Sequence, residues 1–182
     1  MTAMLSPLRV GRITGSRVGA VLGLNKYQSR EDVLAEMVAQ ARGQEQLFVG
    51  NDATQWGQDH ERDAIEEYER QRGAMVYGCQ TFVMHDEFEF LAVTIDGIAN
   101  EDLIVEVKAP FRAQYTSIKQ KPEYEAQVQL QLACMMYDSC DFLIWRQREP
   151  LIIERVGRDR VWLDRNLPTL RSFMDEYQAA IA

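Results

Sequence analysis

The spacing of apolar residues predicts helices in the first part of the chain. Ser29, followed by acidic residues, is typical of a capped helix start, and this helix is expected to run to about Ala41. A longer helix is predicted over residues 52–72, and Gly73 ends it. The apolar face of this second helix is discontinuous and comprises Trp56, Ala64, Ile65 and Tyr68.

Apolar runs in the middle of the chain predict strands. They are expected over residues 80–85, 89–96 and 102–108. The pattern then indicates a helix over 123–137, strands near 141–146 and 151–156, and a final helix over 161–180. Three strands in succession, followed by a helix and another strand, predict an α/β fold with a mixed central β-sheet flanked by helices.

Length and composition fit a globular protein. The 182 residues are 46% hydrophobic and 26% charged, and we expect one domain over residues 1–182. No apolar run approaches the ~20 residues of a membrane span, and basic residues interrupt the first 30 positions, where a secretory signal would lie. Three cysteines without CxxC spacing argue against zinc or an iron–sulfur cluster. These features predict a cytoplasmic protein without a membrane partner.

The charge is unevenly distributed along the chain. The formal net charge is −8, yet residues 1–30 contain five Lys or Arg and no acid, which leaves −13 on the other residues. A second acid-free stretch, 107–122, holds Lys108, Arg112, Lys119 and Lys121. Two basic stretches on an acidic body favour local phosphate contact over general coating of DNA. The alternative is that these side chains only solvate loops and helix faces.

Two acidic residues and a lysine lie where neighbouring strands are expected to meet. Asp96 ends one apolar run, Glu106 and Lys108 end the next, and residues 97–102 can fold the two strands into a hairpin. Because side chains alternate along a strand, Glu106 and Lys108 emerge together while Val107 points into the core. Two carboxylates suit Mg²⁺, and a lysine can orient or activate a water for phosphodiester hydrolysis. The alternative is an ordinary solvated hairpin, since this pattern is common by chance.

Three further side chains are candidates for the same site. Glu61 could be a third acid, although an ordinary surface acid is the alternative in so acidic a helix. Gln127 and Gln131 are four residues apart and share a helix face, where two amides could hold a water or a phosphate oxygen. A solvent-facing pair remains the alternative for these glutamines. Gly57 lies within the same helix as Glu61, which indicates that something approaches closely there.

The first basic stretch could bind a phosphate. If a short helix begins near Ser16, its free backbone N–H groups, the hydroxyls of Thr14 and Ser16, and Arg9 would form a cradle. The alternative is that Thr14 or Ser16 only caps the helix.

Together these pieces resemble the phage lambda exonuclease family, the YqaJ-like viral recombinases, within the PD-(D/E)XK nuclease superfamily. The resemblance covers roughly residues 9–131 in colinear order. Its elements are Arg9 with Ile13-Thr14-Gly15-Ser16, Trp56-Gly57 with Glu61, Asp96-Gly97, Glu106-Val107-Lys108-Ala109-Pro110-Phe111, and Tyr124-Glu125-Ala126-Gln127-Val128-Gln129. One departure is Ile95, which stands where the superfamily name has proline.

The resemblance implies a role for each candidate residue and a restriction-endonuclease-like core for the fold. Asp96, Glu106 and the backbone carbonyl of Val107 would bind divalent metal, with Glu61 nearby. Lys108 would work on the attacking water, and Gln127 would assist. The 5′-phosphate would be held by Arg9 and Ser16. Gln131, just beyond the best-matched stretch, is assigned with Thr14 to DNA contact.

The activity implied is that of a Mg²⁺-dependent 5′→3′ exonuclease on linear double-stranded DNA, with Mn²⁺ able to substitute. It would release mononucleotides and leave 3′ single strands for recombination, as a homotrimeric ring working with a phage single-strand annealing protein. Two alternatives stay open at this point: a restriction or repair endonuclease on the same fold, and a non-catalytic DNA-end-binding protein.

Overall fold

A computed structural model describes residues 7–44 and 52–182. Most helices and strands lie where the hydrophobic pattern predicts them, except that strands of two or three residues were not foreseen. In chain order the elements are η1 (Pro7–Arg9), β1 (Ile13–Thr14), α1 (Gly15–Val21), α2 (Arg30–Ala41), α3 (Asp52–Arg72), β2 (Val76–Tyr77), β3 (Thr81–Met84), β4 (Leu91–Ile95), β5 (Gly97–Ala99), β6 (Leu103–Lys108), η2 (Ile118–Gln120), α4 (Pro122–Met135), β7 (Ser139–Ile144), β8 (Ile152–Gly157) and α5 (Trp162–Ile181).

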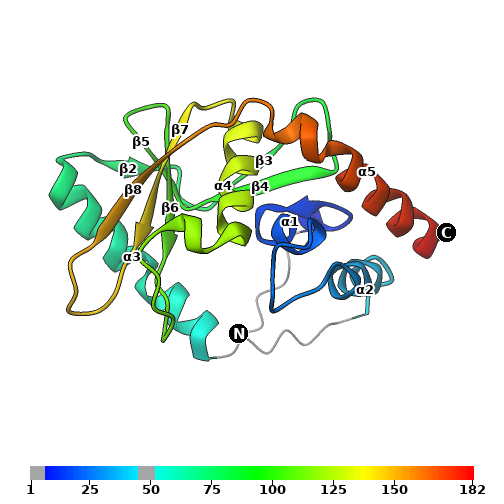
Figure 1. The fold of residues 1–182 in the computed structure, drawn as a ribbon, viewed down its shortest axis with the longest axis horizontal. Coiled ribbons are helices and arrows are strands. Elements are labelled where there is room, and N and C mark those ends of the chain that lie inside the picture. The colour runs from blue at the N-terminus through cyan, green and yellow to red at the C-terminus, as the bar shows by residue number, and fades with distance from the viewer. Residues whose placement is uncertain (1–6, 45–51) are drawn as a thin grey trace.

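The strands form two sheets, with β4 in one and β5 in the other (Figure 1). Asp96 is the residue between these two strands. The larger sheet has the order β2-β5-β6-β7-β8, and the smaller has the order β1-β4-β3. β6 and β7 are parallel, as are β1 and β4, while the other pairs are antiparallel. Helix α4 makes the crossover between β6 and β7, as parallel neighbours require. The predicted mixed sheet flanked by helices is therefore confirmed.

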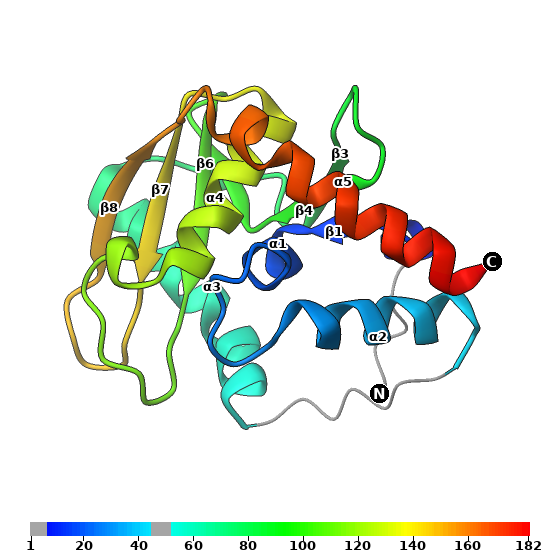
Figure 2. The same cartoon turned by 45° about the vertical axis from the view of Figure 1, so that its right-hand side comes forward.

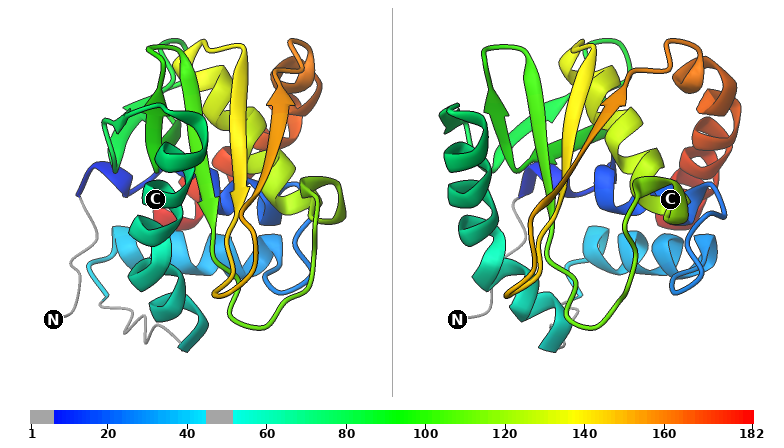
Figure 3. Two further views of the ribbon diagram at one scale, coloured as in Figure 1. Left: turned by 90° about the vertical axis from the view of Figure 1, so that its left-hand side faces the viewer. Right: turned by 60° about the vertical axis from the view of Figure 1, so that its left-hand side comes forward.

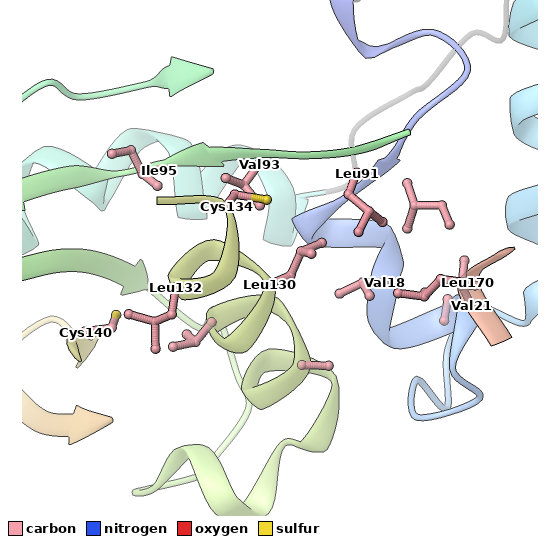
Figure 4. Close-up of a cluster of buried hydrophobic side chains, with 14 of the residues drawn as sticks. Val18, Val21, Leu91, Val93, Ile95, Leu130, Leu132, Cys134, Cys140 and Leu170 are labelled. Carbon is pink, nitrogen blue, oxygen red and sulfur yellow. The ribbon is translucent and has the colours of Figure 1, made fainter. Parts of the chain in front are cut away.

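Helices cover both faces of the larger sheet (Figure 3). On one face α3 packs Ala64 and Tyr68 against alternate residues of β6, among them Val105 and Val107. On the other face lies the main core, to which α1, α4 and α5 contribute. Figure 4 shows its centre, where Val18 of α1, Leu91 of β4 and Leu130 of α4 meet. The alternation along β6 therefore directs Glu106 and Lys108 toward α4.

Helices α2 and α5 bury apolar residues in the main core, among them Met37 and Phe173, and polar contacts add to this packing. α2 begins at a capping box in which Ser29 and Asp32 bond reciprocally, as its sequence predicts. It runs beside α5 (Figure 2), and Arg30 forms a salt bridge of 2.7 Å with Glu176 of that helix. No helix of residues 7–44 or 52–182 is long and apolar enough to cross a membrane.

Glycines allow α1 to lie directly on α4. A Cβ at Gly19 would come within 2.9 Å of Glu123 Cα, and a Cβ at Gly15 would lie 3.3 Å from Gln127 Cγ. The backbones can approach this closely only because both positions lack a side chain. The first turn of α1 is thereby set against the part of α4 that carries Gln127.

The predicted hairpin is wrong in its pairing. Instead of folding back onto β6, β4 pairs with β1 and β3, and the antiparallel partner of β6 is β5. The chain turns at residues 100–102, after bending between β4 and β5. Gly97 permits this route, because a Cβ there would come within 2.2 Å of Val76 Cγ1. One of the two partners of β4 is the two-residue strand β1, for which the sequence carries no periodic signal.

Candidate active site

Asp96 lies at the bend between β4 and β5, next to the strand that carries Glu106. Its Oδ2 accepts a hydrogen bond of 2.8 Å from the backbone N–H of Val107. Asp96, Glu106 and Lys108 line the same cavity. The two carboxylates and the ammonium that we expected at a hairpin are thus brought together, by the divergence of two sheets.

Glu106 is almost fully buried and is held by three donors. Its Oε1 accepts hydrogen bonds of 2.6 Å from Lys108 Nζ and from Gln127 Nε2. Its Oε2 accepts one of 2.6 Å from Gln131 Nε2. Lys108 Nζ also donates to Gln127 Oε1 at 3.2 Å, which closes a ring of three side chains. The orientation of the Glu106 carboxylate is therefore fixed from both sides.

Burial and neighbouring charges set the protonation of the cluster. Burial raises the pKa of Asp96 well above its ordinary value, and Glu106 adds to this shift while Lys108 opposes it. Burial alone would lower the pKa of Lys108, but Glu106 and Asp96 outweigh it, so the pKa of Lys108 is raised. Lys108 is therefore an ammonium at neutral pH, and its single positive charge faces two carboxylates.

Glu61 reaches the same cavity from α3. Its Oε1 accepts a hydrogen bond of 2.7 Å from Gln80 Nε2. Burial raises the pKa of Glu61; the hydrogen bond from Gln80 opposes this shift, and the charge of Glu106 adds to it. Glu61 and Asp96 also line a second hollow of about 800 Å³. Both acids are therefore accessible from two hollows of the surface.

The cavity that Asp96, Glu106 and Lys108 share has a volume of about 550 Å³. Its walls come from the start of α3, the end of β6, residues 109–113 and the first turns of α4. A Cβ at Gly57 would meet nothing within 4 Å, so this glycine leaves open space in the wall. The close approach expected at Gly57 is thus not made by another element of the described structure.

The oxygen atoms gathered here suit a hard divalent cation. Asp96 and Glu106 offer carboxylates, and the backbone carbonyl of Val107 lies beside them in the chain. The raised pKa of Asp96 means that its surroundings do not compensate its charge, a condition that a bound cation would relieve. Among the described residues no three His, Cys, Asp or Glu side chains form a ready metal cluster. Water would complete the coordination, as is usual for Mg²⁺.

Comparison with known proteins identifies the family. A family model described as the YqaJ-like viral recombinase domain matches residues 6–138. The chain belongs to this family. The matched residues include Asp96, Glu106 and Lys108, so the cluster lies within the YqaJ-like domain.

Solved structures share the fold of this YqaJ-like chain. One is the alkaline exonuclease LHK-Exo from Laribacter hongkongensis, with 28% identity and a TM-score of 0.82 over 95% of this chain and 91% of that one. Its complex with dAMP matches with 27% identity, the same TM-score and the same coverage. A phage related exonuclease from Haemophilus somnus 129PT matches in fold, with 15% identity, a TM-score of 0.69 and 93% coverage of both chains. Comparison with curated proteins gives no match.

The predicted phosphate-binding residues of the YqaJ-like domain lie around the start of α1. Ser16 is exposed, whereas Thr14 is buried beneath it with its Oγ1 3.2 Å from Ser16 Oγ. Thr14 makes no side-chain capping bond to the helix. Arg9 is half-buried in η1. The structure thus leaves Ser16 as the hydroxyl that faces solvent, with Thr14 supporting it.

The first basic stretch is less available than its charge of +5 indicates. Arg17 is buried and forms a salt bridge of 2.6 Å with Glu36, and Arg30 is paired with Glu176. Arg12 donates to the backbone carbonyls of Leu8 and Glu89. Arg17 and Arg30 therefore help to hold α1, α2 and α5 together. Of the five basic side chains in this stretch, Arg9 and Lys26 are the ones left as candidates for phosphate contact.

Gln131 does not lie where a DNA contact would be made. It is 0% exposed, and its Nε2 donates to Glu106 Oε2 and, at 3.3 Å, to the backbone carbonyl of Thr94. Both glutamines lie on the inner face of α4, but Gln127 lines the cavity and Gln131, one turn further along the helix, does not. The assignment of Gln131 to DNA contact therefore does not fit its fully buried position.

An aromatic wall was missed from the sequence. Tyr115 and Tyr124 line the cavity, and Lys108 Nζ lies 4.8 Å from the centroid of the Tyr124 ring. Lys121 Nζ lies 5.2 Å from the Tyr115 ring and 5.6 Å from the Tyr124 ring. The available signal was the spacing of Tyr124 three residues before Gln127, which puts both on one helix face.

Proposed function

We propose that this chain is a Mg²⁺-dependent exonuclease that degrades linear double-stranded DNA in the 5′→3′ direction. It releases mononucleotides and leaves 3′ single strands for recombination by strand annealing. The observation that carries this proposal is that Asp96 lines one cavity with the hydrogen-bonded trio of Glu106, Lys108 and Gln127, in a chain of the YqaJ-like family. The fold shared with LHK-Exo supports a nuclease role.

In this proposal Asp96, Glu106 and the Val107 carbonyl hold the divalent ion, with Glu61 near enough to assist. When bound, Mg²⁺ or Mn²⁺ supplies a Lewis acid that polarises the scissile phosphate and lowers the pKa of the attacking water. The protein contributes the rigidity of the site, since each carboxylate has one oxygen fixed by a donor from β6 or α4.

Lys108 and Gln127 act on the reacting groups. Lys108 carries its charge at the cavity and donates hydrogen bonds, so it can orient the water and offset the negative charge that develops on the phosphate. Gln127 accepts from Lys108 and donates to Glu106, which keeps the ammonium directed toward the site. Tyr124 forms the wall behind Lys108.

The 5′-phosphate is assigned to Arg9 and Ser16, with Thr14 supporting Ser16. A Cβ at Gly15, the residue next to Ser16, would lie 3.3 Å from Gln127 Cγ, so this region adjoins the cluster. An arginine and a hydroxyl at that position suit a terminal phosphate. Further parts of the proposal are a homotrimeric ring and a phage single-strand annealing protein as partner, in the cytoplasm of a bacterial host.

Degradation of defined substrates tests the proposed function. Linear duplexes carrying a 5′-phosphate, a 3′-phosphate or neither, and a closed circular duplex, are incubated with and without Mg²⁺. We expect Mg²⁺-dependent release of mononucleotides that is fastest from 5′-phosphorylated linear DNA. Cutting of the circle would favour an endonuclease, and binding of ends without hydrolysis would favour a non-catalytic end-binding protein.

A further inference from the structure

Among the residues that the structure describes, Gln131 is the one buried amide that contacts both β4 and β6. Its Nε2 donates to Glu106 Oε2 on β6 at 2.6 Å and to the carbonyl of Thr94 on β4 at 3.3 Å. Both neighbouring atoms are acceptors, so the NH₂ end of the amide must face them. Helix α4, which carries Gln131, packs against β4 and β6.

The two strands bridged in this way are not paired with each other. β4 belongs to the smaller sheet and β6 to the larger one, so no ladder of backbone hydrogen bonds sets their separation. Asp96 follows Thr94 by two residues, and its own link to β6 is the hydrogen bond from Val107 N–H. After Asp96 the backbone is held to β6, because Gly97 pairs with Val105. Before Asp96, where β4 leaves the larger sheet, the separation from β6 depends on side-chain contacts such as those of Gln131.

We propose that Gln131 is a positioning residue that holds β4 and β6 at the separation at which Asp96 and Glu106 bind a divalent cation together. This inference rests on the proposed function, since it takes both carboxylates to be metal ligands. Gln131 acts through Glu106 and does not touch substrate, because it is fully buried and does not line the cavity.

The two carboxylate oxygens of Glu106 accept hydrogen bonds from different sides of the site. Lys108 and Gln127, which line the cavity, bond to Oε1, while Gln131 bonds to Oε2 from the buried side. In this orientation the side-chain oxygen of Gln131, Oε1, is buried and has no hydrogen-bond partner among the described residues. An unpartnered buried oxygen costs stability, and an apolar side chain would avoid that cost. The amide is therefore explained by what it does for Glu106.

The helix offers a matched control in Gln129. This residue is also buried, but its amide bonds to the carbonyl of Gly157 and the N–H of Asp159, away from the carboxylates. Gln131→Met and Gln129→Met each replace a buried amide on α4 by an unbranched side chain of similar length. Thermal unfolding followed by circular dichroism checks that both variants fold.

The test is Mn²⁺ binding to the purified protein without DNA, measured by electron paramagnetic resonance. Removing a group that orients a metal ligand typically weakens metal affinity by about 10- to 100-fold, and Gln131→Met should show a loss of that size. Gln129→Met should bind Mn²⁺ as the unaltered protein does. In DNA degradation, the Mg²⁺ concentration for half-maximal rate should rise for Gln131→Met alone. If Gln131→Met does not fold, Gln131→Asn, which is too short for both contacts, is measured instead.

Equal Mn²⁺ affinity in Gln131→Met and the unaltered protein would overturn the inference while leaving the proposed nuclease intact. Equal losses in both variants would also overturn it, because they would reflect general loosening of α4. If the unaltered protein neither binds Mn²⁺ nor degrades DNA, the proposed function fails and this inference fails with it.

Discussion

The structure defines both the charge and the hydrogen-bond partners of Lys108. Its ammonium is bonded to Glu106 and Gln127, and the nearby carboxylates keep it charged. A fixed cation at the cavity contributes most where negative charge develops during the reaction. We therefore expect Lys108 to affect the rate of hydrolysis strongly and the affinity for DNA only weakly.

Replacement of Lys108 tests this role. Lys108→Ala should slow DNA degradation by a factor of about 10² or more, because orientation and charge at the reacting phosphate are both lost. DNA affinity, measured by fluorescence anisotropy in Ca²⁺, should stay within about threefold of the unaltered protein. Lys119→Ala, which removes an exposed lysine of the same basic stretch, serves as control. Normal turnover in Lys108→Ala would remove the role assigned to it.

Asp96 should destabilise the protein when no metal is bound. Its pKa in the folded state is raised by burial and by Glu106, so the folded state holds a proton that the unfolded state loses above a pH of about 3.9. Stability of the metal-free protein therefore falls as pH rises through the window between these two pKa values. Asp96→Asn should abolish degradation yet raise the free energy of unfolding at pH 7 in EDTA by about 0.5–2 kcal/mol.

Urea denaturation from pH 4 to 8 measures this difference. The advantage of Asp96→Asn over the unaltered protein should be small at pH 4 and grow toward pH 7. A metal-free protein that is equally stable with Asp and Asn at position 96 would show that the carboxylate carries no uncompensated charge.

Arg9 and Ser16 should distinguish the two chemical forms of a DNA end. Arg9→Ala or Ser16→Ala should lower the rate on 5′-phosphorylated duplex far more than on 5′-hydroxyl duplex. The loss of one charge-assisted contact costs about 1.5–3 kcal/mol, which is roughly ten- to a hundredfold in rate. Equal losses on both kinds of end would mean that these residues contact DNA generally.

At the scale of elements, the contact between α1 and α4 determines where Gln127 lies. Gly19→Ala would put a methyl group within 2.9 Å of the Glu123 backbone and push the helices apart. The expected cost is about 1–3 kcal/mol in the free energy of unfolding. Gly57→Ala is the control, because a methyl group there meets nothing within 4 Å and should stabilise α3 by up to about 1 kcal/mol. Two-state urea unfolding of both variants measures these opposite signs.

The sequence predicted the long elements well and their connections less well. The capping residue Ser29 and Gly73 bound two helices where they were expected, because local chemistry decides where a helix starts and stops. The parallel pairing of β4 with the strand Ile13–Thr14 could not be predicted, since that strand is distant in sequence and too short to show a period.

The same limit applies to the site. Asp96, Glu106, Lys108 and Gln127 were expected together on motif spacing, and the structure brings them together. The position of Gln131 was misjudged, because spacing on a helix gives the shared face but not the depth at which each residue is buried. Tertiary contacts also decide which basic residues of the first 30 form salt bridges within the protein, as Arg17 does with Glu36.

At the scale of the whole molecule, size and charge favour a ring. A compact chain of 182 residues has a radius of gyration of about 16 Å. A single domain of this size could contact one side of a duplex but could not surround it. Residues beyond the first 30 carry −13 and would repel DNA, and two of the N-terminal cations are already paired. Several subunits with their positive residues toward a shared channel would overcome this repulsion.

We therefore expect a cyclic homo-oligomer, and the resemblance to the lambda exonuclease family supplies the number three. A head-to-tail interface that closes on itself gives such a ring. Light scattering at micromolar concentration should report about three times the chain mass of 21.0 kDa. A monomer that still digests kilobases without dissociating would refute the ring, although the nuclease assignment would survive.

We propose that Asp96, Glu106 and Lys108 together form a metal-dependent nuclease centre. The most direct test of this proposal is the rate of mononucleotide release from 5′-phosphorylated linear duplex as Mg²⁺ is titrated, for the unaltered protein and for Glu106→Gln. We expect saturable, Mg²⁺-dependent release by the unaltered protein, none in EDTA, and none from Glu106→Gln at any Mg²⁺ concentration. Release in EDTA, or undiminished release by a folded Glu106→Gln, would contradict it.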